Sequence, residues 1–396
     1  MIALYQLGHS ILILFFFLLL LAPKISNAEI LALVTYESKL AESLKSLKLS
    51  DKQERKEGIS VIDVDPEGEE FGKILMNIPI PAESGIHKIF FDRTMTKAYV
   101  SARNIQGLLV FNLEEFPYRL KKVNIPGCKA GQNLAFSDDN NSWVLTCSMS
   151  QNIFVGEVST NQVFKTVHLP DTYPHGVVIM SDINRILVTS SSSRDFSDRH
   201  DFFTVVELDT GKVINTHKVS SSSSSSPATP SGVFRTPNHL PPSAYISNMF
   251  GDDLWFATWD PKKLDFNVSR ILNFRSFSHR TPLNLYFGID TKKLYITTAN
   301  PGGFHILDIS SNPKKPTLKK SLRTAEGANN AAFTNDGRYS FVQNSLMNLP
   351  KMSDGSITVI DLKSEKVIGS ITTLKKLGLN PTSIILLPKW NYSAQH

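Results

Sequence analysis

The chain lacks the features that mark several protein classes. It has two cysteines in 396 residues, too few for a disulfide scaffold or a four-cysteine zinc site. It has no Cys-x-x-Cys-His segment for haem attachment, no glycine-rich phosphate loop, no metalloprotease motif and no nucleophile elbow. The chain has 42 Lys and Arg residues against 36 Asp and Glu residues, and it has no cluster of basic residues that could bind along a nucleic-acid backbone. These absences argue against nucleic-acid binding and against the common motif-defined enzymes.

The overall composition is that of a folded protein. Hydrophobic residues make up 41% of the chain and charged residues 20%, which is unlike a disordered segment. Length alone suggests two or three domains, but all-β barrels and propellers often exceed that size as one unit.

One long apolar run lies near the start of the chain. Ile11 to Ala22 read ILILFFFLLLLA, and Ser26-Asn27-Ala28 places small residues where a signal peptidase reads. The pattern predicts a secretory signal peptide over residues 1–28, although His9 replaces the usual Lys or Arg. The alternative is an uncleaved anchor, but a membrane span needs roughly 20 apolar residues. We expect a secreted, periplasmic or cell-surface protein with no membrane span after cleavage.

A repeated unit fills most of the remaining chain. Each copy has an apolar strand, a tight Asp/Asn/Gly turn, an alternating strand, a polar loop and a third strand ending in an acid–aliphatic pair. The copies are Phe90–Leu113, Ala135–Val158, Val178–Leu208, Tyr286–Ile309, Ala332–Leu362 and a degraded one from Tyr245 to Phe277. Four short strands recurring about every 40 to 50 residues are typical of propeller blades.

A seventh blade requires strands from both ends of the chain. Asn380–Pro388 begins a blade that has no strands after it. Ile30–Ser38, Gly58–Asp65 and Phe71–Ile80 supply three strands that lack an opening one. Joining them removes the open edges of the ring. The sequence therefore predicts an all-β fold, with residues 29–396 forming a single seven-bladed β-propeller of four-stranded blades closed by a shared blade.

Several segments resemble a known group of repeats. "KAYVSARN" (Lys97–Asn104) and "FTNDGR" (Phe333–Arg338) resemble YVTN-type β-propeller repeats. Gly302–Pro316 is similar to related repeats that read aliphatic-Asp-Ile-Ser followed by Asn-Pro. The resemblance extends over nearly all of residues 30–390 and implies the propeller fold. It implies no single function, because these propellers host many roles, lactonases, lyases and subunits of quinoprotein dehydrogenases among them.

The long insertions are predicted to lie on one face of the ring. They fall in second-to-third-strand loops or interblade links, at residues 37–57, 191–201, 219–241 and 344–356. Leucines at 40, 44 and 47 have the spacing of an amphipathic helix. Residues 219–241 contain seven consecutive serines and several prolines, which predict a mobile loop. Insertions confined to one face usually mark the binding face, although the other face could simply tolerate less.

The third residue of the segment that begins each blade is expected to lie at the channel mouth on that same face, so that the seven residues surround it. These residues are His87, Asn133, His175, Ser243, Leu283, Asn329 and Thr382. Leu283 is the one apolar member, and Asn284 beside it could take its place. The polar side chains could bind a ligand, or they could satisfy strand-end amides and hydrate the channel.

Two histidines and an arginine are the chemically distinctive candidates. His87 and His175 across a channel mouth could ligate a divalent metal, because imidazole is a favoured ligand. Arg103 ends a second strand and could pair with an anion at the mouth, or form a surface salt bridge.

A column of acids ends the third strands of most blades. A residue that recurs blade after blade is structural, and its side chain is expected to cap the following turn. The column is Asp63, Glu157, Glu207, Asp308 and Asp361.

The two cysteines are predicted to meet. Cys128 precedes the first strand of its blade and Cys147 ends the second, so the hairpin between them brings both to the insertion-bearing face. An exported protein lies in a disulfide-permissive compartment, which favours a Cys128–Cys147 bridge over two buried thiols.

The sequence favours a non-catalytic, exported propeller that binds a protein partner or small ligand on the insertion-bearing face and channel mouth. One alternative is a metal-dependent, lactonase- or lyase-like enzyme that uses the channel-mouth histidines. The other is the propeller subunit of a periplasmic redox complex whose cofactor is carried by another chain.

Overall fold

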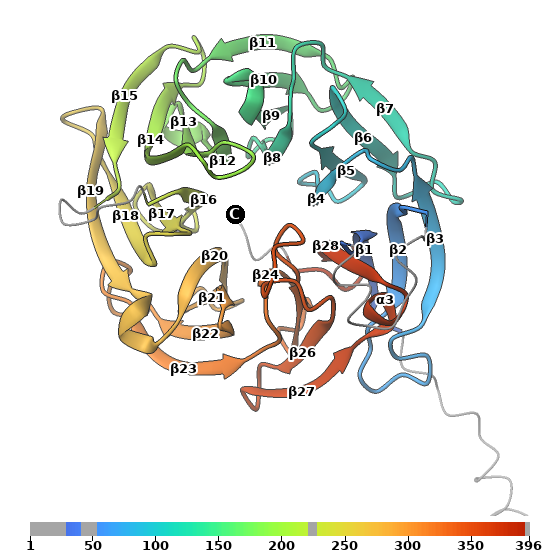
Figure 1. Ribbon diagram of the computed structural model, residues 1–396. Coiled ribbons are helices and arrows are strands. Elements are labelled where there is room, and N and C mark those ends of the chain that lie inside the picture. Colours follow the sequence, from blue (N-terminus) through green and yellow to red (C-terminus); the bar gives the residue numbers. More distant parts are fainter. Residues whose placement is uncertain (1–28, 41–53, 221–227, 393–396) are drawn as a thin grey trace, which may run out of the picture.

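The computed structural model describes residues 29–40, 54–220 and 228–392, and these residues form a ring of seven four-stranded antiparallel sheets (Figure 1). The first three blades in chain order are β4 (Ile86–Phe91), β5 (Lys97–Ala102), β6 (Gly107–Asn112), β7 (Lys121–Asn124); β8 (Gly131–Phe136), β9 (Ser142–Cys147), β10 (Asn152–Glu157), β11 (Val163–His168); and β12 (Pro174–Met180), β13 (Arg185–Ser192), β14 (Arg199–Glu207), β15 (Val213–Lys218).

The next three blades follow the same order, from the innermost strand outwards. They are β16 (Pro230–Arg235), β17 (Ser243–Asn248), β18 (Asp253–Asp260), β19 (Asp265–Asn273); β20 (Arg280–Phe287), β21 (Lys293–Asn300), β22 (Gly302–Asp308), β23 (Thr317–Arg323); and β24 (Ala328–Phe333), β25 (Tyr339–Asn344), β26 (Ile357–Asp361), β27 (Lys366–Ile371). The described helices are short: η1 (Ser148–Ser150), η2 (Ser181–Ile183), η3 (Phe274–Phe277) and α3 (Thr373–Lys376).

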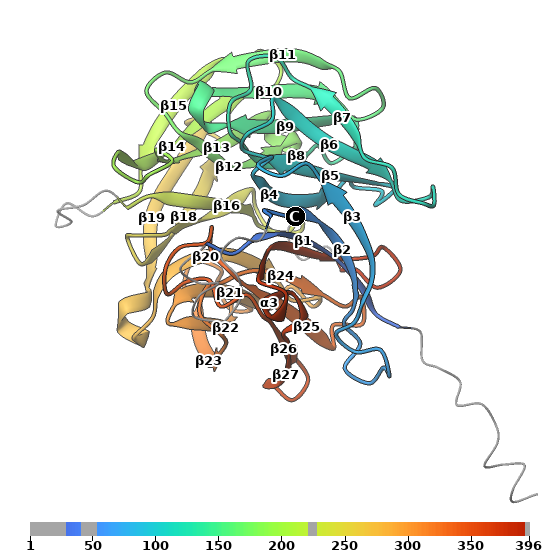
Figure 2. The same ribbon diagram turned by 45° about the vertical axis from the view of Figure 1, so that its right-hand side comes forward.

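The seventh blade confirms the predicted closure. Its strand order is β28 (Leu379–Leu386), β1 (Leu31–Ser38), β2 (Glu57–Asp63) and β3 (Ile74–Ile80). β28 pairs antiparallel with β1, from Ala32 opposite Leu386 to Ser38 opposite Leu379. The last strand of the chain therefore supplies the innermost strand of the blade to which the first three strands belong, and Figure 1 shows the four strands side by side. Figure 2 shows β1, β2 and β3 of this blade in the turned view.

The expected limits of one blade are wrong. The sequence predicts a loop over 219–241 and an innermost strand at Ser243, but Pro230–Arg235 form the innermost strand β16. Ser243 begins β17, and its Oγ donates to the Pro241 carbonyl (2.8 Å), at the end of the blade remote from the insertion-bearing face. The Ser- and Pro-rich composition suggests a loop, yet β16 is buried in the ring, with Val233 4% exposed. Residues 221–227 lie outside the described part.

The four predicted insertions share one end of the ring, but the third-to-fourth-strand connections 64–73, 113–120 and 309–316 at the opposite end are longer than the β13–β14 loop 193–198. The β1–β2, β13–β14 and β25–β26 connections, and the β15–β16 link, all lie at the end of the ring where the innermost strands begin; we call this end the insertion face. Most of the leucine-spaced segment, 41–53, lies outside the described residues, as does the predicted signal peptide. In the part of the chain that the structure describes, no helix has the length and apolar character of a membrane span.

The recurring acids cap turns, as expected. Asp63, Asp308 and Asp361 each accept a hydrogen bond from the backbone N–H two residues later, at 2.9, 2.9 and 2.8 Å. Glu157 and Glu207 each accept from the hydroxyl of a threonine three residues later. These carboxylates hold the turns between third and fourth strands and are not part of the channel.

Candidate functional site

The centre of the ring contains two hollows that share part of their lining. A hollow of about 80 Å³ lies at the insertion face, and a deeper one of about 340 Å³ is lined by the innermost strands of all seven blades. Both are lined by Lys88, Ser231 and Asn284. Arg194 and Met347, from the β13–β14 and β25–β26 loops, line the smaller hollow, so insertion-face loops fold over the channel mouth.

The structure brings the two predicted histidines together. His87 on β4 and His175 on β12 have ring centroids 6.0 Å apart in an edge-to-face arrangement, and both line the smaller hollow. His175 Nδ1 lies 2.6 Å from the Ser231 carbonyl oxygen. Asn133 Nδ2 also lies 3.3 Å from this nitrogen, but the contact with the carbonyl is shorter. Because a carbonyl can only accept, the shorter contact favours a proton on Nδ1 and a lone pair on Nε2 of His175.

The contact of His87 with Arg103 favours the opposite tautomer. Arg103 Nη2 lies 3.5 Å from His87 Nδ1, a long contact, and a guanidinium can only donate, which favours an acceptor at Nδ1 and a proton on Nε2. Nε2 of His87 is buried with no hydrogen-bond partner among the described residues. An orphaned buried donor of this kind is costly unless something accepts from it.

Both histidines are neutral at physiological pH. Burial, followed by the charges of Arg103 and Lys88, holds the pKa of His87 well below its usual range. Burial and the Lys88 charge lower the pKa of His175 to about 3, although its bond to Ser231 opposes the shift. The rings therefore act as polar hydrogen-bonding groups and not as imidazolium ions.

Lys88 is the functional residue that sequence reasoning missed. It follows His87 on β4, and its Nζ donates to Asn133 Oδ1 (3.0 Å) and Asn284 Oδ1 (3.4 Å), on β8 and β20. In the described residues no carboxylate lies within salt-bridge distance of Nζ, and burial lowers the pKa of Lys88 to about 8. In the sequence, Lys88 is marked only by its position directly after His87, one of the residues predicted to surround the channel mouth.

Arg103 lies at the mouth as predicted. It lines the smaller hollow, and its Nε is buried without a hydrogen-bond partner among the described residues. Burial lowers the pKa of Arg103, while the nearby Glu37 carboxylate opposes this shift. Burial in turn raises the pKa of Glu37, and Arg103 opposes that shift. Two carboxylates, Glu37 and Glu57, therefore act on Arg103, whereas Lys88 has no described carboxylate within salt-bridge distance.

The other predicted ring positions divide into two groups. Asn284 rather than Leu283 provides the polar contact at its position, because Asn284 Nδ2 donates to Asn329 Oδ1 (2.7 Å). Asn133, Asn284 and Asn329 thus lie around the floor of the channel mouth. Thr382 is buried and exchanges a hydrogen bond with Thr35 (2.8 Å), so it ties β28 to β1 instead of facing the hollow.

Ser231 takes the position that the sequence assigned to Ser243. Its carbonyl orients His175, and Ser231 lines both hollows. The match of "PHGV" at Pro174–Val177 with "PSGV" at Pro230–Val233 was the signal that could have located β16 and Ser231.

One side of the mouth is apolar. Met249, Leu283 and Leu346 belong to a buried cluster at the insertion face and line the smaller hollow, together with Met347 at its edge. The site therefore combines an amine, a guanidinium and two neutral imidazoles with thioether and aliphatic surface.

The residues at the mouth do not suit a divalent cation. No group of three or more His, Cys, Asp or Glu that could hold a metal occurs within 29–40, 54–220 or 228–392. Of the two histidines, His87 has one nitrogen facing Arg103 and the other enclosed by protein. Lys88 places a positive charge there with no described carboxylate within salt-bridge distance, and this charge repels a cation and attracts an anion.

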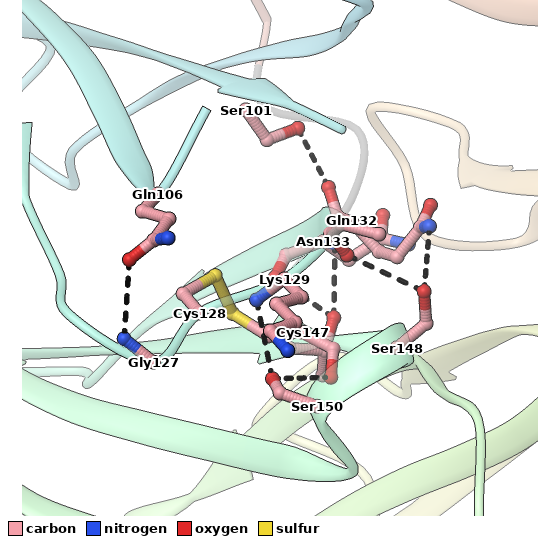
Figure 3. The surroundings of a disulfide bond; sticks show 12 residues. Ser101, Gln106, Gly127, Cys128, Lys129, Gln132, Asn133, Cys147, Ser148 and Ser150 are labelled. Carbon is pink, nitrogen blue, oxygen red and sulfur yellow. Dashed lines mark hydrogen bonds between the residues drawn. A yellow bond between two sulfur atoms is a disulfide. The ribbon is translucent and has the colours of Figure 1, made fainter. Parts of the chain in front are cut away.

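A disulfide bond supports one wall of the mouth (Figure 3). Cys128 and Cys147 are joined, with Cα atoms 5.3 Å apart and a sequence separation of 19, and both are fully buried. Next to them, Gln132 Nε2 donates to Ser148 Oγ (3.0 Å), and both residues line the smaller hollow. The disulfide therefore braces the segments that carry this part of the wall.

Comparison with known proteins identifies the fold. No family model and no curated protein matches the chain. A hypothetical selenium-binding protein from Sulfolobus tokodaii superposes with a TM-score of 0.73 at 12% identity, over 93% of this chain and 95% of that one. Hydrazine synthase of Kuenenia stuttgartiensis gives 0.58 at 12% identity, over 78% and 92%.

A Bacteroides fragilis protein described as a candidate 6-phosphogluconolactonase gives a TM-score of 0.59 at 13% identity, over 92% of this chain and 99% of that one. At such identities the likeness shows the propeller fold alone, because propellers with this shape carry unrelated functions.

Proposed function

We propose that this propeller is a binding protein for a small organic anion, which enters the channel mouth from the insertion face. The observation that carries the proposal is Lys88, a channel lysine whose Nζ contacts two carboxamide oxygens and no described carboxylate. A buried cation without a counter-ion attracts an anion more strongly than a solvated lysine does. Arg103, which lines the smaller hollow, offers a further donor at the same mouth.

The apolar side of the mouth indicates the rest of the ligand. Met249, Leu283 and Leu346 would contact a hydrocarbon group while the anionic group binds toward Lys88. Small aryl or alkyl carboxylates have this chemistry. The names of the structural neighbours add selenite as one inorganic anion worth including among the probes.

Isothermal titration calorimetry with benzoate tests the proposal. Charge-assisted hydrogen bonds contribute about 1.5 to 3 kcal/mol, so Lys88→Met should weaken benzoate binding roughly 10- to 100-fold. Lys122→Met is the matched control, because Lys122 is exposed on the outermost strand β7 and should leave affinity unchanged. Titrations with selenite and acetate, which carry negative charge without an aromatic ring, then show whether binding requires the charge alone or also the apolar group of the ligand.

Two results would overturn the proposal. One is equal benzoate affinity in Lys88→Met and in the native chain. The other is stoichiometric divalent metal in the purified protein that is lost in His87→Ala/His175→Ala, since a metal would make the histidines the primary ligands. Elemental analysis of both proteins therefore accompanies the titrations.

We also infer that the chain is exported. The apolar run Ile11–Ala22 and the small residues Ser26–Ala28 support a cleaved leader, and a buried disulfide suits an oxidising compartment. Amino-terminal sequencing of protein recovered outside the cytoplasm should begin at Glu29, and recovery of unprocessed protein from the cytoplasm alone would contradict export.

A further inference from the structure

The contacts of Lys88 suit an uncharged amine as well as an ammonium. A protonated lysine has three N–H donors, whereas a neutral one has two donors and a lone pair. Nζ has two hydrogen-bond acceptors among the described residues, the side-chain oxygens of Asn133 and Asn284. The Ser231 carbonyl, which accepts from His175, is not among the hydrogen-bond partners of Nζ. Two N–H groups of Lys88 are thus satisfied, and the remaining tetrahedral position of Nζ is free of a described partner.

Empty space borders Lys88 in the channel. Lys88 lines both the hollow at the mouth and the larger hollow beneath it. Near Lys88 the larger hollow has polar lining from Asn133, Ser231 and Asn284 and apolar lining from Ile89 and Leu134. Burial without a carboxylate partner disfavours the ammonium form of lysine and lowers the pKa of Lys88 to about 8. The charged or titratable residues that line either hollow with Lys88 are His87, Asp92, Arg93, Arg103, His175, Arg194, Tyr286 and Tyr392.

We propose that Lys88 is a nucleophile that forms an imine with a small aldehyde or ketone bearing an anionic group. This rests on the anion site proposed above, in which Arg103 would hold the ligand's charge at the mouth while its carbonyl carbon reaches Lys88. The Nζ lone pair attacks the carbonyl carbon and forms a C–N bond, and the carbonyl π electrons pass to oxygen. Both amine hydrogens leave with that oxygen as water, giving the C=N bond; nothing is oxidised or reduced.

Reductive trapping with glyoxylate tests the proposal, because glyoxylate carries an aldehyde beside a carboxylate. Cyanoborohydride converts any imine to a carboxymethylated lysine, which peptide mass spectrometry locates. With the pKa of Lys88 at about 8 against an ordinary value of 10.5, Lys88 should be labelled on the order of 100-fold faster than exposed lysines near neutral pH. The exposed Lys122 provides the internal comparison.

Two variants separate this proposal from the anion site. Lys88→Arg keeps a positive charge but cannot form an imine, so it should give no channel adduct, while benzoate binding by the native chain reports on the anion site separately. Asn133→Asp places a carboxylate beside Nζ with little change of shape, favours the ammonium, and should slow labelling of Lys88 about tenfold for each unit by which the pKa rises. Thermal unfolding of each variant checks that the ring is intact.

Labelling of Lys88 no faster than Lys122, in a native chain that still binds benzoate, would overturn imine formation and leave the anion site standing. Loss of both glyoxylate labelling and benzoate binding in the native chain would overturn both. Labelling at Lys88 that Asn133→Asp leaves unchanged would show that the channel environment does not activate the amine, which also contradicts the proposal.

Discussion

Removal of the disulfide should affect both the stability of the ring and the wall of the binding site. The perturbation is the double variant Cys128→Ala/Cys147→Ala. Alanine is preferred to serine because both positions are fully buried, and a hydroxyl there would need a hydrogen-bond partner. The bridge closes a loop with a sequence separation of 19, and the chain-entropy relation for such a loop corresponds to about 3 kcal/mol.

The structure suggests a second effect at the channel. Ala130, Gln132, Ser148 and Met149 line the smaller hollow and lie within four residues of the bridge. Their mutual contacts, such as the Ser148 N–H donating to the Ala130 carbonyl (3.0 Å), remain after the bridge is removed. Because the wall loses its covalent brace, benzoate binding should weaken. The loss should be smaller than in Lys88→Met, because these contacts remain and Lys88 itself lies on β4, outside the bridged hairpin.

Thermal unfolding followed by circular dichroism measures the first effect. For a chain of this length a loss of about 3 kcal/mol lowers the midpoint by roughly 4 °C. The native protein under a reductant that reaches the bridge should approach the midpoint of the double variant, and the variant itself should not respond to reductant. An unchanged midpoint in the double variant would refute the reasoning, since the bridge would then not restrain the unfolded chain.

Two further substitutions test the packing and electrostatics of the ring. Gly156→Ala should lower stability by about 1 to 3 kcal/mol in urea unfolding, because a Cβ there would lie 2.0 Å from Cζ2 of the buried Trp143. Gly369→Ala, whose Cβ would meet nothing nearer than a Phe71 carbon at 3.9 Å, is the control and should be close to neutral. Burial raises the pKa of Asp253 to about 6, so the folded state holds this proton more tightly than the unfolded chain, and stability falls as pH rises from about 4 to about 6. Asp253→Asn should thus be more stable than the native chain by about 1 to 3 kcal/mol at pH 7.5 and lose that advantage near pH 4; an equal difference at both pH values would contradict the assignment.

Much of the fold could be predicted because it depends on local patterns. Strand alternation, Asp/Asn/Gly turns and the acid at the end of each third strand recur within each blade, and hydrogen bonds between sequence neighbours enforce them. The blade shared between the two ends followed from counting strands. β16 was missed because its short, Pro- and Ser-flanked strand has few apolar residues, and its burial comes from neighbouring blades instead of its own composition.

The candidate site could be predicted only in part. His87, His175, Asn133 and Arg103 were found because blade starts and second-strand ends have defined places in a propeller. Their roles were not determined, because the tautomer of His175 depends on Ser231, 56 residues away, in a strand the sequence did not reveal.

By itself the sequence determined seven blades, the closure of the ring, the face that carries the insertions and the proximity of two cysteines. These depend on periodicity and chain order, which residue types record directly. Only the tertiary structure decided that Lys88 lies in the channel between Asn133 and Asn284, the latter 196 residues away along the chain. The charge balance of the channel arises from side chains of separate blades that meet only when the ring closes, and no local pattern encodes that meeting.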